Sequence, residues 1–235
     1  MARPSTRETA RTLLPHVLRR LRADRSRFLL GICGPPGVGK SSLAEALVEE
    51  FEATQEPDTA VVVALDGFHL RQAELERRGQ AHIKGAPETF DAAGFVDLLE
   101  RLRRSQRVLV PRFDRALEEP VADAVAVDHR HRLVIVEGNY LLHDGAWAPV
   151  RRLLDEVWQL NLPADLRVAA LIARHVRHGR SPDAAQKWVH RSDEANAQLI
   201  LAAAARAHAS VDLLTGELLG GDVLRDGVLS GDLSA

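Results

Sequence analysis

The feature that most constrains the fold is a glycine-rich segment, Gly-Pro-Pro-Gly-Val-Gly-Lys-Ser, at residues 34–41. It matches the pattern G-x-x-x-x-G-K-[ST] at every fixed position, between an apolar run at residues 27–33 and a helical pattern at residues 41–51. The glycines let the backbone curl so that successive N–H groups point at phosphate oxygens, and the N-terminus of the following helix favours the same anion. The segment therefore predicts a strand–loop–helix unit that binds a nucleoside triphosphate.

The residues of this phosphate loop have expected roles. Lys40 is expected to reach the β- and γ-phosphates, and the Ser41 hydroxyl to ligate Mg²⁺. The residues predicted to bind ATP are Gly34, Pro35, Pro36, Gly37, Val38, Gly39, Lys40, Ser41 and Ser42. The sequence contains neither the Asn-Lys-x-Asp segment of a GTPase nor the Ser-Gly-Gly signature of a transporter ATPase. These absences favour a small-molecule kinase among the proteins that carry such a loop.

Short apolar runs alternate with helical stretches along the chain. Strands are predicted at residues 27–33, 60–65, 108–110, 132–136 and 156–162. Strands without polar alternation belong in a sheet that is covered on both faces, which usually means parallel strands with helices outside. The prediction is an α/β fold of the P-loop NTPase type: a three-layer sandwich with a mostly parallel five-stranded sheet and helices on both faces.

The rest of the chain divides into three predicted parts. Residues 1–26 contain an amphipathic helix, and residues 27–214 form the loop-bearing domain. Residues 166–209 are predicted to form two helices broken near residues 178–182, with a helical lid at about 167–190. In the tail, residues 215–235, either a strand pair forms around 217–219 and 222–229 or the segment is partly disordered.

Composition excludes several other classes of protein. Thirty-one basic against 33 acidic residues give a formal charge of -2, so a dedicated nucleic-acid binder is not expected. Cys33 is the one cysteine, which excludes an intramolecular disulfide and a cysteine-based zinc site. No apolar run is long enough to span a bilayer, and residues 1–27 lack the pattern of a secretory signal. We therefore expect a cytoplasmic protein with no membrane partner.

Polar residues follow the predicted strands, where ligands bind in open parallel sheets. Asp66 follows the second strand and is the candidate general base, because a kinase needs a group that accepts or orients the proton of the attacking hydroxyl. The alternative is that Asp66 only caps a helix. His69 either contacts the substrate or is a packing histidine.

Two further sets of charges complete the predicted chemistry. Glu137 ends the fourth strand, where a carboxylate holds Mg²⁺ directly or through water. Arg174 and Arg180 lie on the predicted lid, where guanidinium groups stabilise the charge of the transferring phosphoryl group. Since almost all basic residues of this chain are arginines, a solvated helix face is the competing interpretation of these two.

Five segments occur with the phosphate loop in a fixed order. They are Asp-Gly-Phe-His at 66–69, Lys-Gly-Ala-Pro-Glu-Thr-Phe-Asp at 84–91, Pro-Arg-Phe-Asp at 111–114, Glu-Gly-Asn-Tyr at 137–140 and Ala-Arg-His-Val at 173–176. Together they resemble the phosphoribulokinase/uridine kinase family, most of all its bacterial branch labelled nucleoside/nucleotide kinase-like or fructose-transport-system kinase. The resemblance covers about residues 28–213.

The resemblance implies an ATP-dependent kinase that acts on a hydroxyl of a small metabolite. It assigns the base to Asp66, the Mg²⁺ contacts to Ser41 and Glu137, and lid functions to Arg174 and Arg180. The residues expected around the acceptor are His69, Lys84, Asp91, Arg112, Asp114 and Tyr140, and core packing is the competing role of Tyr140. Dimers are plausible in this family, so a homodimer is left open.

The acceptor itself stays open in the sequence. Uridine kinases usually have a His-Pro-Asp-Ala-Phe-Asp segment where this chain has Gly-Ala-Pro-Glu-Thr-Phe-Asp at 85–91, and residues 115–120 lack their following His and Arg pattern. The prediction is therefore transfer of the γ-phosphate of ATP, with Mg²⁺, to a nucleoside, a sugar or a related metabolite. A pantothenate-like acceptor is one alternative, and an ATP-binding regulatory switch without metabolite kinase activity is another.

Overall fold

A twisted, mostly parallel sheet organises the protein. The computed structural model describes residues 3–23 and 27–220. The main sheet has the strand order β2-β5-β1-β6-β7-β8. Its strands are β1 (Phe28–Cys33), β2 (Ala60–Ala64), β5 (Leu133–Gly138), β6 (Glu156–Asn161), β7 (Ala209–Asp212) and β8 (Glu217–Gly220). Every neighbouring pair is parallel except β7 with β8. β1 lies inside the sheet, so the loop that follows it opens at the carboxyl edge.

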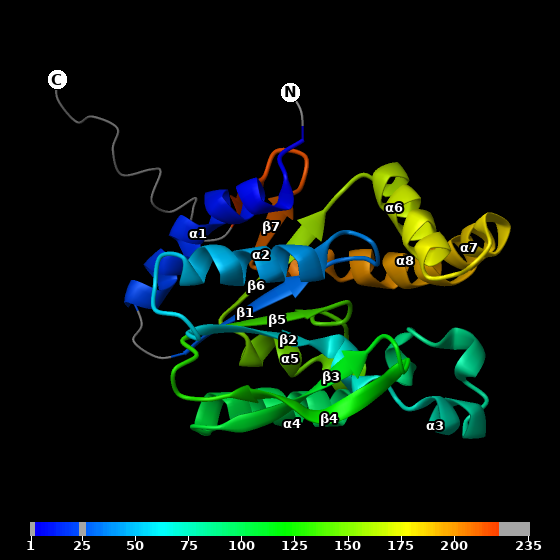
Figure 1. Cartoon of the computed structure of the whole chain (residues 1–235), viewed down its shortest axis with the longest axis horizontal. Helices are drawn as coiled ribbons and strands as arrows, with labels where there is room; N and C mark the ends of the chain where they lie inside the picture. Colours follow the sequence, from blue (N-terminus) through cyan, green and yellow to red (C-terminus); the bar gives the residue numbers. More distant parts are fainter. Residues whose placement is uncertain (1–2, 24–26, 221–235) are drawn as a thin grey trace.

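Helices cover both faces of the sheet (Figure 1). The helices α1 (Thr6–Ala23) and α2 (Lys40–Glu52) lie on one face, and α4 (Ala92–Arg104) and α5 (Val150–Leu153) on the other. Side chains alternate between the faces along β1, since Leu30 packs into the core under α1 and α2 while Leu29 packs into the core under α4 and α5. The predicted three-layer α/β architecture is confirmed.

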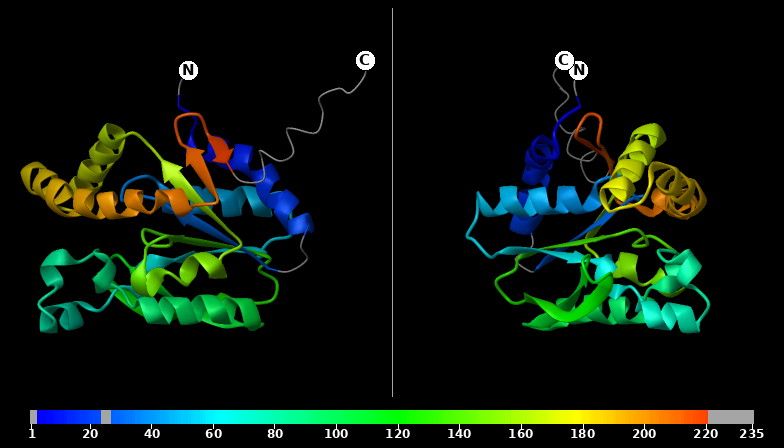
Figure 2. Two further views of the ribbon diagram at one scale, coloured as in Figure 1. Left: turned by 180° about the vertical axis from the view of Figure 1, so that it is seen from behind. Right: turned by 45° about the vertical axis from the view of Figure 1, so that its right-hand side comes forward.

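Among the described residues the main sheet has six strands rather than the predicted five: the segment predicted as its third strand is not a member, while β7 and β8 are. The segment predicted as the third strand belongs to β3 (Val108–Asp114), which pairs only with β4 (Glu119–Val127) in a separate antiparallel sheet. Figure 2 shows this hairpin beside α4, below the main sheet. Val108, Val110 and Val127 bury their side chains against the α4 side of the core, while the alternate residue Leu109 is exposed. An apolar run of three residues did not distinguish a central parallel strand from a hairpin with one buried face.

The chain after β6 is largely helical, as predicted, and its helices lie at one end of the sheet (Figure 1). α6 (Ala164–Arg177) ends before Gly179, and α7 (Pro182–Trp188) begins with Ser181 as its N-cap. A π-helical turn, Val189–Asp193, joins α7 to α8 (Glu194–Ala202). The segment predicted as the end of a helix at about residue 209 is instead the start of β7, the fifth parallel strand.

The two ends of the described chain pack on the same side of the molecule. α1 is tied to α2 by the Arg11 Nε–Glu50 Oε2 ion pair at 3.0 Å and to the sheet by His16 Nε2, which lies 3.0 Å from Glu156 Oε1. β8 takes β7 as its antiparallel partner. The second strand predicted for the tail, at residues 222–229, lies outside the described residues. Among the helices that the structure describes, none has the length and apolar character needed to cross a membrane.

Candidate active site

The phosphate loop lies between the carboxyl end of β1 and the first turn of α2. The Lys40 side chain is buried along the loop, and its Nζ donates hydrogen bonds to the carbonyl oxygens of Gly34 at 2.9 Å and Pro35 at 3.3 Å. Burial lowers the pKa of Lys40, and the negative charge of Glu137 opposes that shift. The ammonium is therefore held in place beside the loop, where phosphates of a nucleotide would offset the cost of its desolvation.

Two oxygen-bearing side chains meet at the start of α2. The Ser41 hydroxyl donates a hydrogen bond of 2.9 Å to Glu137 Oε1 at the end of β5. Glu137 is 5% exposed, and burial together with the nearby carboxylate of Asp66 raises its pKa. A hydroxyl and a carboxylate next to a phosphate loop are the hard oxygen donors that Mg²⁺ prefers, so these side chains fit the ion.

Asp66 is placed by a tight turn after β2. It lies in the 3-10 turn Leu65–Phe68, and the next residue, Gly67, packs directly on β3. A Cβ on Gly67 would lie 2.4 Å from the carbonyl oxygen of Pro111, so only glycine lets the two segments approach this closely. The Asp66 side chain is about 40% exposed, and its Oδ2 lies 3.7 Å from the Arg115 guanidinium. The carboxylate is accessible rather than buried.

Two cavities meet at Asp66. An inner cavity of about 170 Å³ is lined by the phosphate loop residues Pro36, Gly37, Lys40 and Ser41, together with Glu137. An outer cavity of about 870 Å³ opens beside it. The residues that line both are Asp66, His69, Lys84, Gly85, Arg115 and Arg174. A group held in the inner cavity and a molecule held in the outer one would thus meet beside the Asp66 carboxylate.

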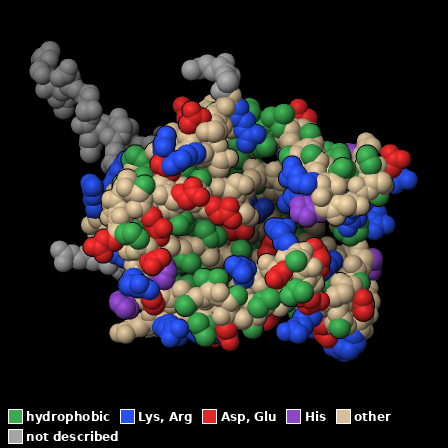
Figure 3. Space-filling model, viewed as in Figure 1, with side chains coloured by type: hydrophobic (Ala, Val, Ile, Leu, Met, Phe, Trp, Pro, Cys, Tyr) green, Lys and Arg blue, Asp and Glu red, His purple; other side chains and the backbone are tan. Residues whose placement is uncertain are grey.

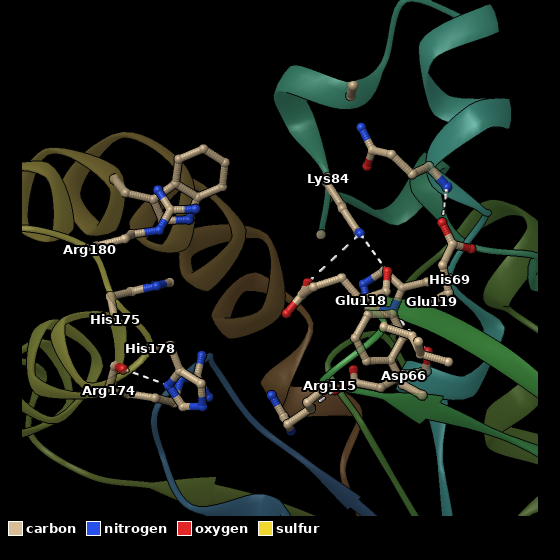
Figure 4. A pocket seen from close by; sticks show the side chains of 16 residues that line it. Asp66, His69, Lys84, Arg115, Glu118, Glu119, Arg174, His175, His178 and Arg180 are labelled. Atoms are coloured by element: carbon tan, nitrogen blue, oxygen red, sulfur yellow. Dashed lines mark hydrogen bonds and ion pairs between the residues drawn. The ribbon is translucent and has the colours of Figure 1, made fainter.

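The outer cavity lies between two walls (Figure 4). Residues of α6, α7 and the segment between them form one wall, which includes Arg174, His175, His178, Arg180 and Trp188. The turn after β2 and the β3–β4 hairpin contribute to the opposite wall, which includes His69, Gln72, Phe113, Glu118 and Glu119. Figure 3 shows basic side chains gathered around the hollow between these two parts of the molecule.

The two arginines predicted for the lid differ in position. Arg174 lines both cavities and contributes to the positive field that acts on Lys40. Arg180 lines only the outer cavity, where its guanidinium carbon lies 4.2 Å from the ring centroid of Trp188. Arg174 is therefore the one of the two that faces the phosphate loop.

His69 and Lys84 line both cavities. Nδ1 of His69 donates to the Asp66 carbonyl oxygen at 2.9 Å, and the ring packs 4.0 Å from that of Phe90, centroid to centroid. Burial lowers the pKa of His69, so the ring is held neutral. Lys84 Nζ donates to the carbonyl oxygen of Glu118 at 3.2 Å and lies 5.6 Å from the centroid of Phe113.

Four residues predicted to contact the acceptor do not line either cavity. Arg112 and Asp114 flank Phe113 on β3, and alternation along a strand turns their side chains away when Phe113 faces the cavity. Asp114 Oδ1 instead accepts from the backbone N–H groups of the following turn. Asp91 is the N-cap of α4, and Tyr140 is 1% exposed with its hydroxyl donating to the Gly85 carbonyl oxygen at 2.5 Å.

Arg115 is a side chain of the site that sequence reasoning missed, whereas the sequence leaves the positions of Asp193 and Asn196 open. Arg115 lines both cavities, while Asp193 and Asn196 line the inner one. Arg115 is two residues beyond Phe113, at the start of the turn that follows β3, so continuing the alternation of the strand by one residue is the signal that points to it. Asp193 and Asn196 are three residues apart at the junction of the π-helical turn with α8, a spacing that leaves open whether they face the cleft or the surface. The structure places both at the inner cavity.

A phosphate loop at the carboxyl edge of a parallel sheet, with a lysine, a serine–carboxylate pair and an arginine of α6 around it, defines a P-loop kinase. The family model of the phosphoribulokinase/uridine kinase family matches residues 29–219. The chain therefore belongs to this family. It is a phosphotransferase that binds ATP and phosphorylates a small molecule.

The chain is also similar to individual proteins and solved structures. The chain is 32% identical over 205 residues to the protein YggC of Escherichia coli strain K12, covering 85% of this chain and 84% of that one. A crystal structure from Silicibacter sp. TM1040, named "putative fructose transport system kinase", is 39% identical with a TM-score of 0.75, covering 85% of this chain and 95% of that chain. A pantothenate kinase of Nocardioides sp. is 34% identical over 115 residues, which are 48% of this chain and 35% of that protein.

Proposed function

We propose that the protein transfers the γ-phosphoryl group of ATP, with Mg²⁺, to a hydroxyl group of a sugar, a nucleoside or a related metabolite. The observation that carries the proposal is the position of Asp66, which lines both the cavity at the phosphate loop and the larger cavity beside it. An acceptor hydroxyl in the outer cavity would meet a carboxylate on its path to the loop.

The residues divide the work of such a transfer. As the acceptor oxygen forms its bond to the γ-phosphorus and the bond to ADP breaks, Asp66 takes the hydroxyl proton. Lys40 and Arg174 stabilise the charge that spreads over the phosphoryl oxygens. Ser41 and Glu137 would hold Mg²⁺, which supplies further neutralisation of the phosphates when bound.

The outer cavity suits an acceptor with several polar groups. Gln72, Glu118 and Glu119 bring amide and carboxylate groups to one wall, and Trp188 brings an aromatic ring to the other. Hydroxyl-rich molecules are recognised by such combinations of hydrogen-bonding groups and ring faces. A pantothenate-like acceptor is the alternative substrate, and the similarity to the Nocardioides pantothenate kinase supports including it.

The test is ATP turnover across a panel of free sugars, nucleosides and pantothenate, with release of ADP as the measurement. We expect one class of acceptor to stimulate ADP release in the presence of Mg²⁺, and the phosphorylated product to be found by mass spectrometry. Tight ATP binding without stimulation by any acceptor would contradict the proposal and favour a nucleotide-dependent regulatory switch.

A further inference from the structure

A buried arginine of α6 contacts the phosphate loop without lining the inner cavity. Arg167 is 2% exposed, and its Nη1 donates a hydrogen bond of 3.3 Å to the carbonyl oxygen of Pro36. Its Nη2 lies 2.7 Å from Oε1 of Glu194, the first residue of α8. One guanidinium thus joins the loop to a carboxylate on a third element.

α6 packs on the loop with no space between them. Gly37 of the loop has a φ of +79°, and a Cβ there would lie 2.5 Å from Leu171 Cγ and 3.0 Å from the carbonyl oxygen of Arg167. α6 and the loop are therefore in direct contact, and a side chain at position 37 would clash with the helix. Arg167 and Leu171 lie on the same face of that helix, one turn apart.

The hydrogen bond from Arg167 to the Pro36 carbonyl bears on anion binding because it holds the direction of that carbonyl. A phosphate loop binds its anion with N–H groups that converge on one point, so the carbonyl groups of the loop must point elsewhere and find donors there. Lys40 supplies a donor to the carbonyls of Gly34 and Pro35, and Arg167 supplies one to the carbonyl of Pro36. The N–H directions and these carbonyl contacts are set by the same peptide planes.

Two residues close to Glu194, at the start of α8, also contact segments that line the cavities. Asp193 Oδ2 lies 2.9 Å from His175 Nε2 on α6, and the Asn196 amide donates to the carbonyl oxygen of Gly85 at 3.3 Å. Glu194 lies between these two residues and reaches the phosphate loop through Arg167. A π-helical turn of this kind often marks a functional position.

We propose that Arg167 and Glu194 are positioning residues of the phosphate loop, which set its affinity for ATP without touching the nucleotide. The guanidinium holds the Pro36 carbonyl turned outward, and Glu194 compensates the charge of that buried guanidinium. The inference rests on the proposed binding of ATP at this loop, and it does not depend on which acceptor is phosphorylated.

The test is the dissociation constant for ATP, measured by calorimetry without acceptor, together with the melting temperature. The variants are Arg167→Lys, which keeps the charge but loses the fork that bonds two partners, and Glu194→Gln, which keeps the shape but loses the charge. We expect both to weaken ATP binding about tenfold. The matched control is Arg103→Lys, because Arg103 likewise joins a backbone carbonyl, that of Leu153, to a carboxylate, that of Asp155, outside both cavities.

A double variant separates positioning from stability. Arg167→Met with Glu194→Leu replaces the buried ion pair by apolar side chains of similar size, which are expected to preserve folding but leave the Pro36 carbonyl without its donor. Weak ATP binding by a double variant that melts near the wild-type temperature supports the proposal. Wild-type ATP affinity in that variant or in Arg167→Lys overturns it, as does an equal loss of affinity in Arg103→Lys. Failure of the proposed function is a separate readout, the absence of acceptor-stimulated ADP release.

Discussion

Replacing Asp66 by asparagine tests the proposed chemistry most directly. The change keeps the size and shape of the side chain and removes the group that accepts the hydroxyl proton. Because Asp66 lines both cavities, the substitution acts where the acceptor and the phosphoryl group would meet. An amide still accepts a hydrogen bond from the hydroxyl, so acceptor binding should be largely retained while proton transfer is lost.

The expected magnitudes follow from the position of the carboxylate. General base catalysis contributes roughly 10²- to 10⁴-fold, so kcat should fall by that factor, which corresponds to about 3–5 kcal/mol in the barrier. Stability should change by less than about 1 kcal/mol, because the Asp66–Arg115 ion pair is long and its side chains are 40% and 59% exposed. The affinity for ATP should change by a small factor only, since Lys40 and the loop amides are untouched.

The assay is steady-state ADP release with the acceptor selected by the panel, with the ATP affinity and the melting temperature of the same preparations. The control is Asp91→Asn, the same chemical change at a helix N-cap that lines neither cavity and where asparagine caps as well as aspartate. A turnover within about threefold of wild type in Asp66→Asn, or an equal loss in Asp91→Asn, would refute the assignment of the base.

Three further predictions concern the surrounding residues. Of the two arginines, Arg174 reaches the inner cavity and Arg180 does not. Arg174→Ala should therefore lower kcat by about 10²-fold or more, whereas Arg180→Ala should mainly raise the acceptor KM. Steady-state kinetics of both variants measure this difference. Glu137→Gln should abolish Mg²⁺-dependent turnover yet raise the melting temperature at neutral pH. Burial raises the pKa of Glu137, so ionising this carboxyl as the pH rises lowers the free energy of unfolding of the wild type. The difference in melting temperature between Glu137→Gln and the wild type should therefore vanish below about pH 4, where the carboxyl is protonated in the unfolded chain as well. Tyr140→Phe removes the hydrogen bond to the Gly85 carbonyl and should lower the free energy of unfolding, measured in urea, by about 1 kcal/mol. Because Gly85 lines both cavities, the same variant should raise the acceptor KM with little change in kcat.

The geometry of the nucleotide side could be predicted from the sequence because it is encoded locally. Eight consecutive residues specify the phosphate loop, and the apolar run before it specifies a buried strand, so the backbone N–H groups need no distant partner to converge. Glu137 was predictable for a related reason. The carboxyl ends of neighbouring parallel strands meet at one edge of a sheet, and the structure brings Glu137 to 2.9 Å from Ser41 there.

The acceptor side depended on packing that no local pattern contains. A run of three apolar residues on β3 fits a central strand as well as a hairpin, and the choice decided that Phe113 and Arg115, rather than Arg112 and Asp114, face the cavity. A side chain's direction follows from the register and from the neighbours that its element finds, which are set only when distant segments pack together.

The same reason explains the support of the phosphate loop. Sequence alone specified the loop that would bind phosphate, but only the tertiary structure placed Arg167 of α6 under Pro36 and Glu194 of α8 beside that guanidinium. In an arginine-rich chain, the sequence does not indicate which of the many arginines will be buried. Burial and pairing distinguish it, and both exist only in the folded protein.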